Sequence, residues 1–458
     1  MKITKSHYSN FFERRLRGWI SSLWILPLLL LTLPAVVQAQ FVYTINSGAV
    51  TIMSYTGAGG AVTIPSVIDG MPVTTIGAYA FYNSVSLTSV TIPNSVTNLQ
   101  SGAFNHCSSL TSVAIPYSVT SIEQETFGYC TNLTGITVNA ANPSYSSLDG
   151  VLFDKNRTWL IAYPGGKTGT YAIPSGVTNI YSYAFLGSAR LTHVTLPESM
   201  TSIGYGALYG CSSLTGVTIP DSVTSLDESA FQECVNLISI TLPNSVINIG
   251  MGAFDSCTKL ISITIPNSVT DIGAWAFGDC FSLTNVAIPN SVTSIGVRAF
   301  NSCYGLTAIT VDVANAFYSS VDGVLFDKSQ TKLIQCPGAK SGIYTLPGSV
   351  TVIGDEAFQS CIYLTSVTIP NSVTSIENYA FDGCTNLTSV TIGTSVISIG
   401  DGAFGGFLGC TSLTGVYFHG NAPSVGSDVF YNGTNATVYY LPGTTCQRRD
   451  ENAVTAPA

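Results

Sequence analysis

The pair Ala-Phe, with two residues and then Cys after it in most copies, recurs every 23 residues along most of the chain. A fixed period of this size is typical of solenoids, because one unit is too small to bury its apolar residues and must stack on copies of itself. The repeated aromatic position holds Phe81, Phe104 and Phe127, then Phe185, Leu208, Phe231, Phe254, Phe277 and Phe300, then Phe358, Phe381 and Phe404. The sequence therefore predicts an elongated array of stacked coils.

One unit indicates how each coil is built. Residues 260–265 alternate apolar and polar side chains, which predicts a half-buried strand. Pro266 ends this strand, because proline has no amide proton for a ladder. A turn and a short extended piece follow, and the spacing within residues 275–280 suits one helical turn held by packing. Each coil is expected to consist of strand, turn, short extended piece and helical turn.

The repeated pattern resembles that of a known family. It reads Leu-x-x-Ile-x-Ile in the strand, then Ile265-Pro266-Asn267-Ser268-Val269-Thr270, Ile272-Gly273, Ala276-Phe277, Cys280 and Leu283-Thr284. It is similar to the BspA-like bacterial leucine-rich repeats, over about residues 61–442. The resemblance implies an α/β repeat solenoid, a right-handed superhelix that is rich in strands with short helical turns. It also implies an exported or surface-displayed binding or adhesion protein, and it brings no catalytic residues.

Two interruptions break the period in the same way. Each adds 35 residues, near 138–172 and near 311–345, and the sequence of residues 145–155 reappears almost unchanged at 318–328. Both copies hold an Asp-Gly pair between extended runs, which is a strong hairpin signal. We expect two β-hairpin insertions that project from one flank, and a larger block that was duplicated. Such twin hairpins suggest bivalent binding.

The two ends differ from the repeats. Residues 1–39 combine basic residues, an apolar stretch and a small-x-small site before Gln40, which predicts a signal peptide and hence a secreted or cell-surface protein. The alternative is an uncleaved membrane anchor, the only expected contact with a membrane. Residues 40–60 are expected to form an N-terminal cap. The polar tail at 443–458 is expected to be disordered, or else truncated before an anchoring module.

The charge balance argues against polyanionic partners. Without residues 1–39 the chain carries a net charge of −13, and its only adjacent basic pair there is Arg448 and Arg449. Nucleic acid is therefore not an expected partner, because its phosphates require a basic surface.

Ten of the 12 cysteines occupy one repeat position: Cys107, Cys130, Cys211, Cys234, Cys257, Cys280, Cys303, Cys361, Cys384 and Cys410. An even count in an exported protein is compatible with a disulfide framework. A buried column of free thiols is the preferred interpretation, because equivalent side chains in a stack point the same way and cannot easily adopt disulfide torsions. Ser84 and Ser188 fill the same position in two other coils. Cys336 and Cys446 lie outside the column.

Candidates for catalysis are few, and no enzyme, cofactor or metal site is expected. His106, His193 and His419 are interpreted as solvated surface residues. The pairs Asp149 with Asp154 and Asp322 with Asp327 could be glycosidase carboxylates, although turn formation explains them first. The cysteines lack the spacing of metal ligands.

The remaining information lies on the surface. Variable residues next to each Ala-Phe pair resemble the composition of binding sites, although they could equally be unconstrained solvent positions. The candidates for a binding surface are Tyr181, Tyr183, Tyr209, Trp275, Arg298 and Tyr379. The preferred hypothesis is a non-enzymatic binding or adhesion scaffold for an extracellular protein or polysaccharide. The alternatives are a purely structural envelope or matrix protein, and an accessory module of polysaccharide degradation.

Overall fold

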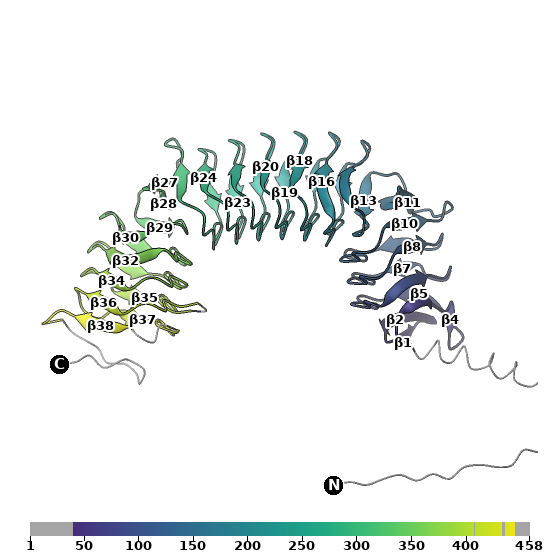
Figure 1. The fold of residues 1–458 in the computed structure, drawn as a ribbon, viewed down its shortest axis with the longest axis horizontal. Helices are drawn as coiled ribbons and strands as arrows, with labels where there is room; N and C mark the ends of the chain where they lie inside the picture. The colour runs from purple at the N-terminus through teal and green to yellow at the C-terminus, as the bar shows by residue number, and fades with distance from the viewer. Residues whose placement is uncertain (1–39, 407, 433–435, 445–458) are drawn as a thin grey trace, which may run out of the picture.

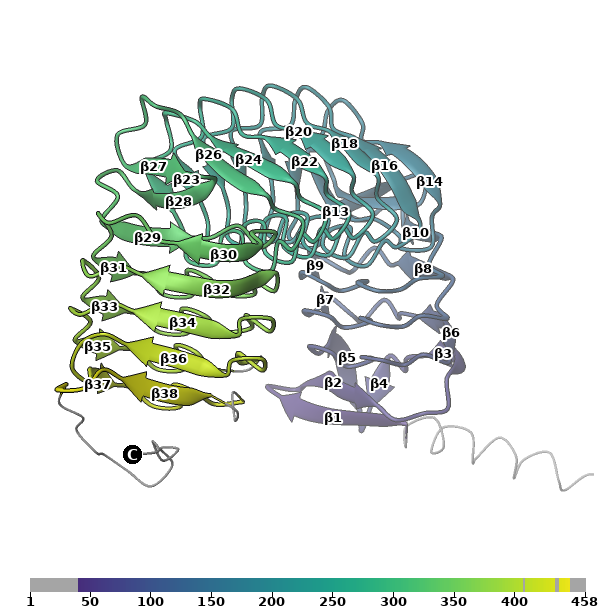
Figure 2. The same ribbon diagram turned by 60° about the vertical axis from the view of Figure 1, so that its left-hand side comes forward.

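The computed structural model describes residues 40–406, 408–432 and 436–444. The coils stack into an arch that changes direction twice, near β11–β13 and near β27–β29 (Figure 1). On both sides of each corner the strands run side by side in regular ladders, as the C-terminal strands show in Figure 2. Equivalent residues of successive coils pair in parallel, so that Ile240 lies beside Ile263. Residues one repeat period apart in the sequence are therefore the residues that pair in the sheets.

The strands form three stacks, each with two parallel ladders. The first stack contains β1 (Phe41–Asn46), β2 (Ala49–Tyr55), β3 (Gly60–Thr63), β4 (Val67–Ile68), β5 (Met71–Ile76), β6 (Leu87–Thr91), β7 (Asn98–Leu99), β8 (Ser112–Ile115), β9 (Ser121–Ile122) and β10 (Gly135–Val138). Strand β4 adds a small hairpin to the edge of β5.

The second stack lies between the corners. Its strands are β11 (Tyr145–Leu148), β12 (Val151–Asp154), β13 (Trp159–Ala162), β14 (Gly169–Ala172), β15 (Asn179–Ile180), β16 (Leu191–Thr195), β17 (Ser202–Ile203), β18 (Gly216–Thr218), β19 (Ser225–Leu226), β20 (Ser239–Thr241), β21 (Asn248–Ile249), β22 (Ser262–Thr264), β23 (Asp271–Ile272), β24 (Asn285–Ile288), β25 (Ser294–Ile295) and β26 (Ala308–Val311).

The third stack completes the described chain. Its strands are β27 (Tyr318–Val321), β28 (Val324–Asp327), β29 (Lys332–Gln335), β30 (Gly342–Thr345), β31 (Val352–Ile353), β32 (Leu364–Ile369), β33 (Ser375–Ile376), β34 (Ser389–Ile392), β35 (Ser398–Ile399), β36 (Gly415–Phe418), β37 (Ser424–Val425) and β38 (Thr437–Tyr440).

The expected helical turn, and with it the α/β class, is wrong: the described residues contain no helix. Residues 273–280 form what we call the double turn, in which Trp275 and Asp279 have positive φ values of 58° and 51°. Alternate amides bond to the next coil, as Phe277 N does to Ala299 O, while Gly278 N bonds to Trp275 O three residues back. A helix needs negative φ and bonds to the fourth residue back, so the ladder between coils replaces it.

The interior between the two ladders is apolar and divides at the corners. Three core clusters fill the three stacks, and at each corner β12 or β28 contributes fully buried residues to two of them. In β12, Val151 and Phe153 pack into the second core while Leu152 packs into the first. In β28, Val324 and Leu325 divide in the same manner between the third and second cores. Each of these strands is a wall with two buried faces.

This arrangement corrects the expected position of the hairpins. The strands β11 and β12 do pair antiparallel, as do β27 and β28. Leu152 and Phe153, however, are fully buried, so that the hairpins lie within the stack and do not project from a flank. Because a wall strand has alternating side chains on both faces, it can seal two cores at once.

A buried asparagine fixes each corner. Asn142 donates from Nδ2 to the carbonyl oxygens of Pro116 and Val119, both at 2.8 Å. Its Oδ1 accepts from the amides of Ser144 and Tyr145, at 2.9 and 2.8 Å. Asn315 forms the four corresponding bonds at the second corner. One side chain thus ties the wall hairpin to the preceding coil and satisfies four backbone groups.

Each stack has the same arrangement at or near its start, which we call the entry module: β1–β3, β12–β14 and β28–β30. In each, two antiparallel strands with a register shift are followed by a strand that joins the next parallel ladder. The residue after or at the end of the second strand donates to the alanine carbonyl of the next coil: Tyr55 to Ala80, Tyr163 to Ala184, and Cys336 to Ala357, all at 2.7 Å. The expected N-terminal cap and the two insertions therefore share one structure.

Candidate functional site

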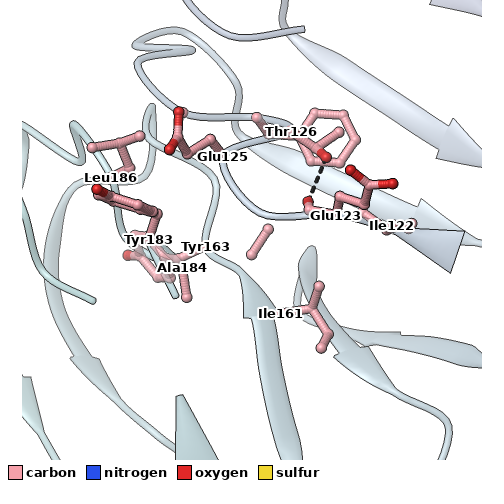
Figure 3. A pocket seen from close by; sticks show the side chains of 12 residues that line it. Ile122, Glu123, Glu125, Thr126, Ile161, Tyr163, Tyr183, Ala184 and Leu186 are labelled. Atoms are coloured by element: carbon pink, nitrogen blue, oxygen red, sulfur yellow. Dashed lines mark hydrogen bonds between the residues drawn. The ribbon is translucent and has the colours of Figure 1, made fainter. Parts of the chain in front are cut away.

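A surface cleft arises at the first corner because the entry module has no double turn. Six residues connect β13 to β14, whereas 12 connect β23 to β24 in an ordinary coil. The double turn of residues 123–130 therefore faces that of residues 181–188 with no double turn between them. Glu125, Tyr183 and Leu186 line the resulting opening, and Ile161 and Tyr163 of the entry module lie at its inner end (Figure 3).

The opening widens outward into a cleft of about 460 Å³, which we call the first-corner cleft. The cleft is open to solvent, so that it is a groove on the surface and not an enclosed pocket. Aromatic side chains dominate its lining, which consists of Tyr79, Tyr82, Asn105, His106, Glu125, Tyr129, Tyr183, Leu186 and Tyr209. Five tyrosines thus share one concave surface, and none of the lining residues is a lysine or an arginine.

Two groups of rings flank the cleft. On one side, Tyr82 packs edge to face on His106 with ring centroids 5.3 Å apart, and His106 stacks on Tyr129 at 4.3 Å. On the other side, Tyr183 contacts Tyr205 at 5.1 Å and Tyr209 at 6.4 Å. These separations are typical of attractive aromatic pairs, which hold the rings in place around the cleft.

Glycines make room for three of the lining rings: Gly102 for Tyr79, Gly187 for Tyr129 and Gly206 for Tyr183. Tyr79 lies over Gly102, where an added Cβ would come within 2.3 Å of the ring, and Tyr129 lies over Gly187, where it would come within 2.4 Å. Tyr129 therefore reaches across the corner from one stack to the next. Only glycine leaves this space.

The cleft carries negative charge. Tyr79 donates to Glu125 at 3.1 Å, and Tyr209 donates to Glu233 at 2.7 Å. Burial first, and then the charge of Glu233, raises the pKa of Tyr129 to about 12. Burial lowers the pKa of His106, which is therefore neutral at pH 7. The carboxylates thus meet no positive side chain in the lining.

The second corner has a different surface on the same backbone. Arg298 occupies the position equivalent to Glu125, and Glu356 occupies that of Tyr183; all four have φ between 56° and 60°. The guanidinium of Arg298 pairs with Glu356 through Nε and Nη2, and it lies 4.8 Å from the ring centroid of Trp275. The second corner is therefore closed by an internal cation between an aromatic face and a carboxylate.

The structure divides the predicted surface residues between these places. Tyr183 and Tyr209 meet in the first-corner cleft, and Trp275 and Arg298 meet at the second corner. Tyr379 lies over Gly402 in the third stack, whereas Tyr181 packs against the core and the ring of Trp159. Glu125 and Tyr129 were missed. The signal that could have found them is the cluster of tyrosines on both sides of the first interruption.

The cysteine column is buried. Nine of its thiols donate to the backbone carbonyl at the aromatic position of the preceding coil, at 3.0–3.4 Å. Cys361 instead lies near the carbonyl of Cys336, at 3.7 Å, because Cys336 belongs to the entry module. The ten column cysteines and Cys336 are free thiols in the structure, and Cys446 lies outside the described residues.

The other candidates have structural surroundings. Asp154 accepts bonds from the amides of Thr158 and Trp159, and Asp327 has the equivalent partners, so turn formation accounts for both. Burial opposes ionisation of Asp327, but these hydrogen bonds together lower its pKa. His106, interpreted from the sequence as solvated, is half-buried among aromatic rings, which corrects that interpretation.

The described residues offer neither a metal-binding cluster nor a membrane-spanning helix. No group of three or more His, Cys, Asp or Glu residues in this part of the chain could hold a metal ion. Within the same residues, no helix could cross a bilayer. The predicted signal peptide and the tail lie outside the described residues, apart from Gly443 and Thr444.

Comparisons with known proteins place the chain in a family. Residues 61–155 and, in overlapping segments, 167–453 match the BspA type leucine rich repeat region. The chain belongs to this family. No curated protein matches this BspA-type protein.

Solved structures of bacterial repeat proteins are similar to this BspA-type chain. A leucine rich cell surface protein from Faecalibacterium prausnitzii is 28% identical, covers 88% of this chain and 93% of its own, and has a TM-score of 0.45. A leucine-rich repeat protein from Bacteroides ovatus is 25% identical to this chain, with a TM-score of 0.46. The match covers 88% of this chain and 98% of the Bacteroides chain. The pneumococcal vaccine antigen PcpA is 22% identical, has a TM-score of 0.50 and shares the fold. The match covers 65% of this chain and 86% of the PcpA chain.

Proposed function

We propose that this BspA-type chain is an exported, non-enzymatic scaffold that binds an extracellular protein or polysaccharide. The family supports this proposal, since one similar solved protein is described as a cell surface protein. The observation that carries it is the first-corner cleft, which has a volume of about 460 Å³ and is lined mainly by aromatic side chains. Exposed aromatic side chains that are fixed by their neighbours supply much of the energy of protein recognition.

The scaffold suits this role because its coils hold the rings rigidly. The aromatic residues of the cleft lie on double turns whose amides bond to neighbouring coils, as His106 N does to Gly128 O at 2.9 Å. Such preorganisation reduces the entropy lost on binding.

A binding screen tests this function. The purified chain would be immobilised and exposed to panels of extracellular-matrix proteins and bacterial and host polysaccharides. We expect saturable binding to at least one material, weakened by Tyr82→Ala and unaffected by Tyr117→Ala. Tyr82 and Tyr117 are 53% and 49% exposed, but only Tyr82 lines the cleft. The release of reducing ends from a polysaccharide would instead favour a role in polysaccharide degradation.

A structural role as a matrix protein is the second candidate, and one observation favours it. Strand β38 has a partner on one side only among the described residues, and the nearby side chains Tyr431, Tyr439 and Leu441 are exposed. An open sheet edge with exposed apolar groups is a template for association between copies. Light scattering across a concentration series distinguishes the two: growing oligomers with no ligand in any panel would support the matrix role.

A further inference from the structure

The two corners have the same backbone, but only the second has a positively charged side chain of this chain, Arg298, inside it. Their backbones agree between the two copies, with Asn142 and Asn315 bonded identically to the preceding coils. At the second corner, Arg298 fills the space between Trp275 and Glu356. At the first corner, the position of Arg298 holds Glu125. The first corner therefore offers a carboxylate and aromatic rings without a cation, whereas at the second corner a carboxylate and an aromatic ring already hold the guanidinium of Arg298.

The position equivalent to Trp275 explains the shape of the first corner. It is Gly102, and the ring of Tyr79 from the preceding coil lies over it. The aromatic face is thus retained at the first corner, but it comes from a neighbouring coil. Tyr79 also donates to Glu125 at 3.1 Å, which fixes the carboxylate next to that ring.

From this comparison we infer that the first-corner cleft binds a guanidinium or alkylammonium cation, presented as an arginine or lysine side chain of a partner protein. This inference rests on the proposed binding function and names the chemistry of the partner at this site. The cation would lie against the tyrosine rings and pair with Glu125, as Arg298 does with Trp275 and Glu356 at the second corner. Cations are attracted to aromatic faces, and the bond to a carboxylate is strengthened by charge.

The charge of the molecule agrees with such a partner. The chain beyond residue 39 has a net charge of −13, so that a basic protein is attracted to it at long range. The lining of the cleft contains one carboxylate and no lysine or arginine. Its volume of about 460 Å³ also leaves room for the backbone beside the basic side chain.

A calorimetric titration of the purified chain with acetyl-Gly-Arg-Gly-amide tests this inference. We expect the peptide to bind, its neutral analogue with Gln in place of Arg to bind at least about tenfold more weakly, and cellotetraose not to compete. Glu125→Gln should weaken binding of the Arg peptide about tenfold and Tyr82→Ala several-fold. The matched surface controls Glu198→Gln and Tyr117→Ala should leave it unchanged. Circular dichroism would verify that each variant is folded.

A second variant copies the closed corner. The double variant Glu125→Arg with Tyr183→Glu should form an internal pair like that of Arg298 and Glu356, and should no longer bind the peptide. The inference is overturned if the Arg and Gln peptides bind equally, if cellotetraose is preferred, if the cleft variants bind like the unchanged protein, or if no cation binds at millimolar concentration. Should the panel ligands still bind in these cases, the proposed function stands and only this assignment fails.

Discussion

The thiol of Cys107 donates a hydrogen bond to the backbone carbonyl of Phe81 in the preceding coil, with 3.1 Å between Sγ and the oxygen. The same carbonyl accepts the amide of Ser84 within its own coil. Each thiol therefore supplies a second bond to a buried carbonyl and joins two coils. This bond to the backbone, together with the free state of the described cysteines, favours a column that remains reduced.

The cysteine column should be protected in the folded protein and fully titratable after unfolding. Burial raises the pKa of Cys211 to about 12, so at pH 8 almost no reactive thiolate is present. We expect negligible reaction with a thiol reagent at pH 8, and reaction of all ten column cysteines once denaturant is added without reductant. Protection of the thiols in denaturant would demonstrate disulfides and contradict the prediction.

The same burial predicts a loss of stability in alkali. The pKa of Cys211 rises from 9.0 in the unfolded chain to about 12 in the fold, so its contribution is complete below pH 9 and is lost between pH 9 and 12. We expect the urea midpoint to fall between pH 8.5 and 11. Cys211→Ser should show a smaller fall, because serine does not titrate there and is found at this repeat position in Ser188. An identical fall in both proteins would refute this assignment.

Asp255 should destabilise the protein near neutral pH. Burial first, and then the charge of Asp279, raises its pKa from 3.8 to about 6, and its Oδ1 is buried without a hydrogen-bond partner. A raised pKa favours folding below pH 4 and loses that contribution as the pH passes through 6. Asp255→Asn is expected to stabilise the chain by about 1 kcal/mol at pH 7.5. Chemical denaturation measures this change, and exposed Asp221→Asn serves as the control.

Asn142 should be essential to the first corner. Its replacement by alanine removes four hydrogen bonds and leaves buried backbone groups without partners, which costs about 3 kcal/mol or more. Asn244→Ala, at an exposed position of an ordinary coil, should change stability by less than about 0.5 kcal/mol. Thermal and urea unfolding of the two variants would measure the difference, and equal effects would rule out the role assigned to Asn142.

A charged side chain on one face of β12 should destabilise the first stack and leave the second stack folded. Leu152 packs only into the first core, whereas Val151 and Phe153 pack into the second. Leu152→Asp is therefore expected to increase hydrogen exchange in residues 41–138 and to leave residues 191–311 protected, because repeat arrays couple through neighbouring units. Exchange that rises equally throughout would indicate a single cooperative core.

The regular coils could be predicted from the sequence because their register equals the repeat. The positions of Cys257 and Ile263 recur every 23 residues in the ordinary coils, and parallel stacking keeps equivalent residues such as Ile240 and Ile263 side by side. The Asp149-Gly150 turn was also predictable, since positive φ at both residues suits a tight hairpin. The double turn was not, because a positive φ at Trp275 has no signal in the identity of the residue.

The first-corner cleft could not be predicted from the repeat. It depends on the short connection after β13, which brings Glu125 close to Tyr183 across a break in the period. The walls were missed for a related reason: Leu152 and Phe153 look like one apolar run, and only the stacking shows that they face different cores. Asn142 had a weak signal in its copy at Asn315, which lies at the equivalent place in the second interruption.

The entry module also determines how such a protein can change its outline during evolution. Adding or removing ordinary coils alters the length of a straight arm, whereas adding the larger duplicated block supplies a new arm together with its bend. Gene duplication can therefore lengthen an arm or add a bend separately, and the surfaces at the bends can diverge, as those around Glu125 and Arg298 already have.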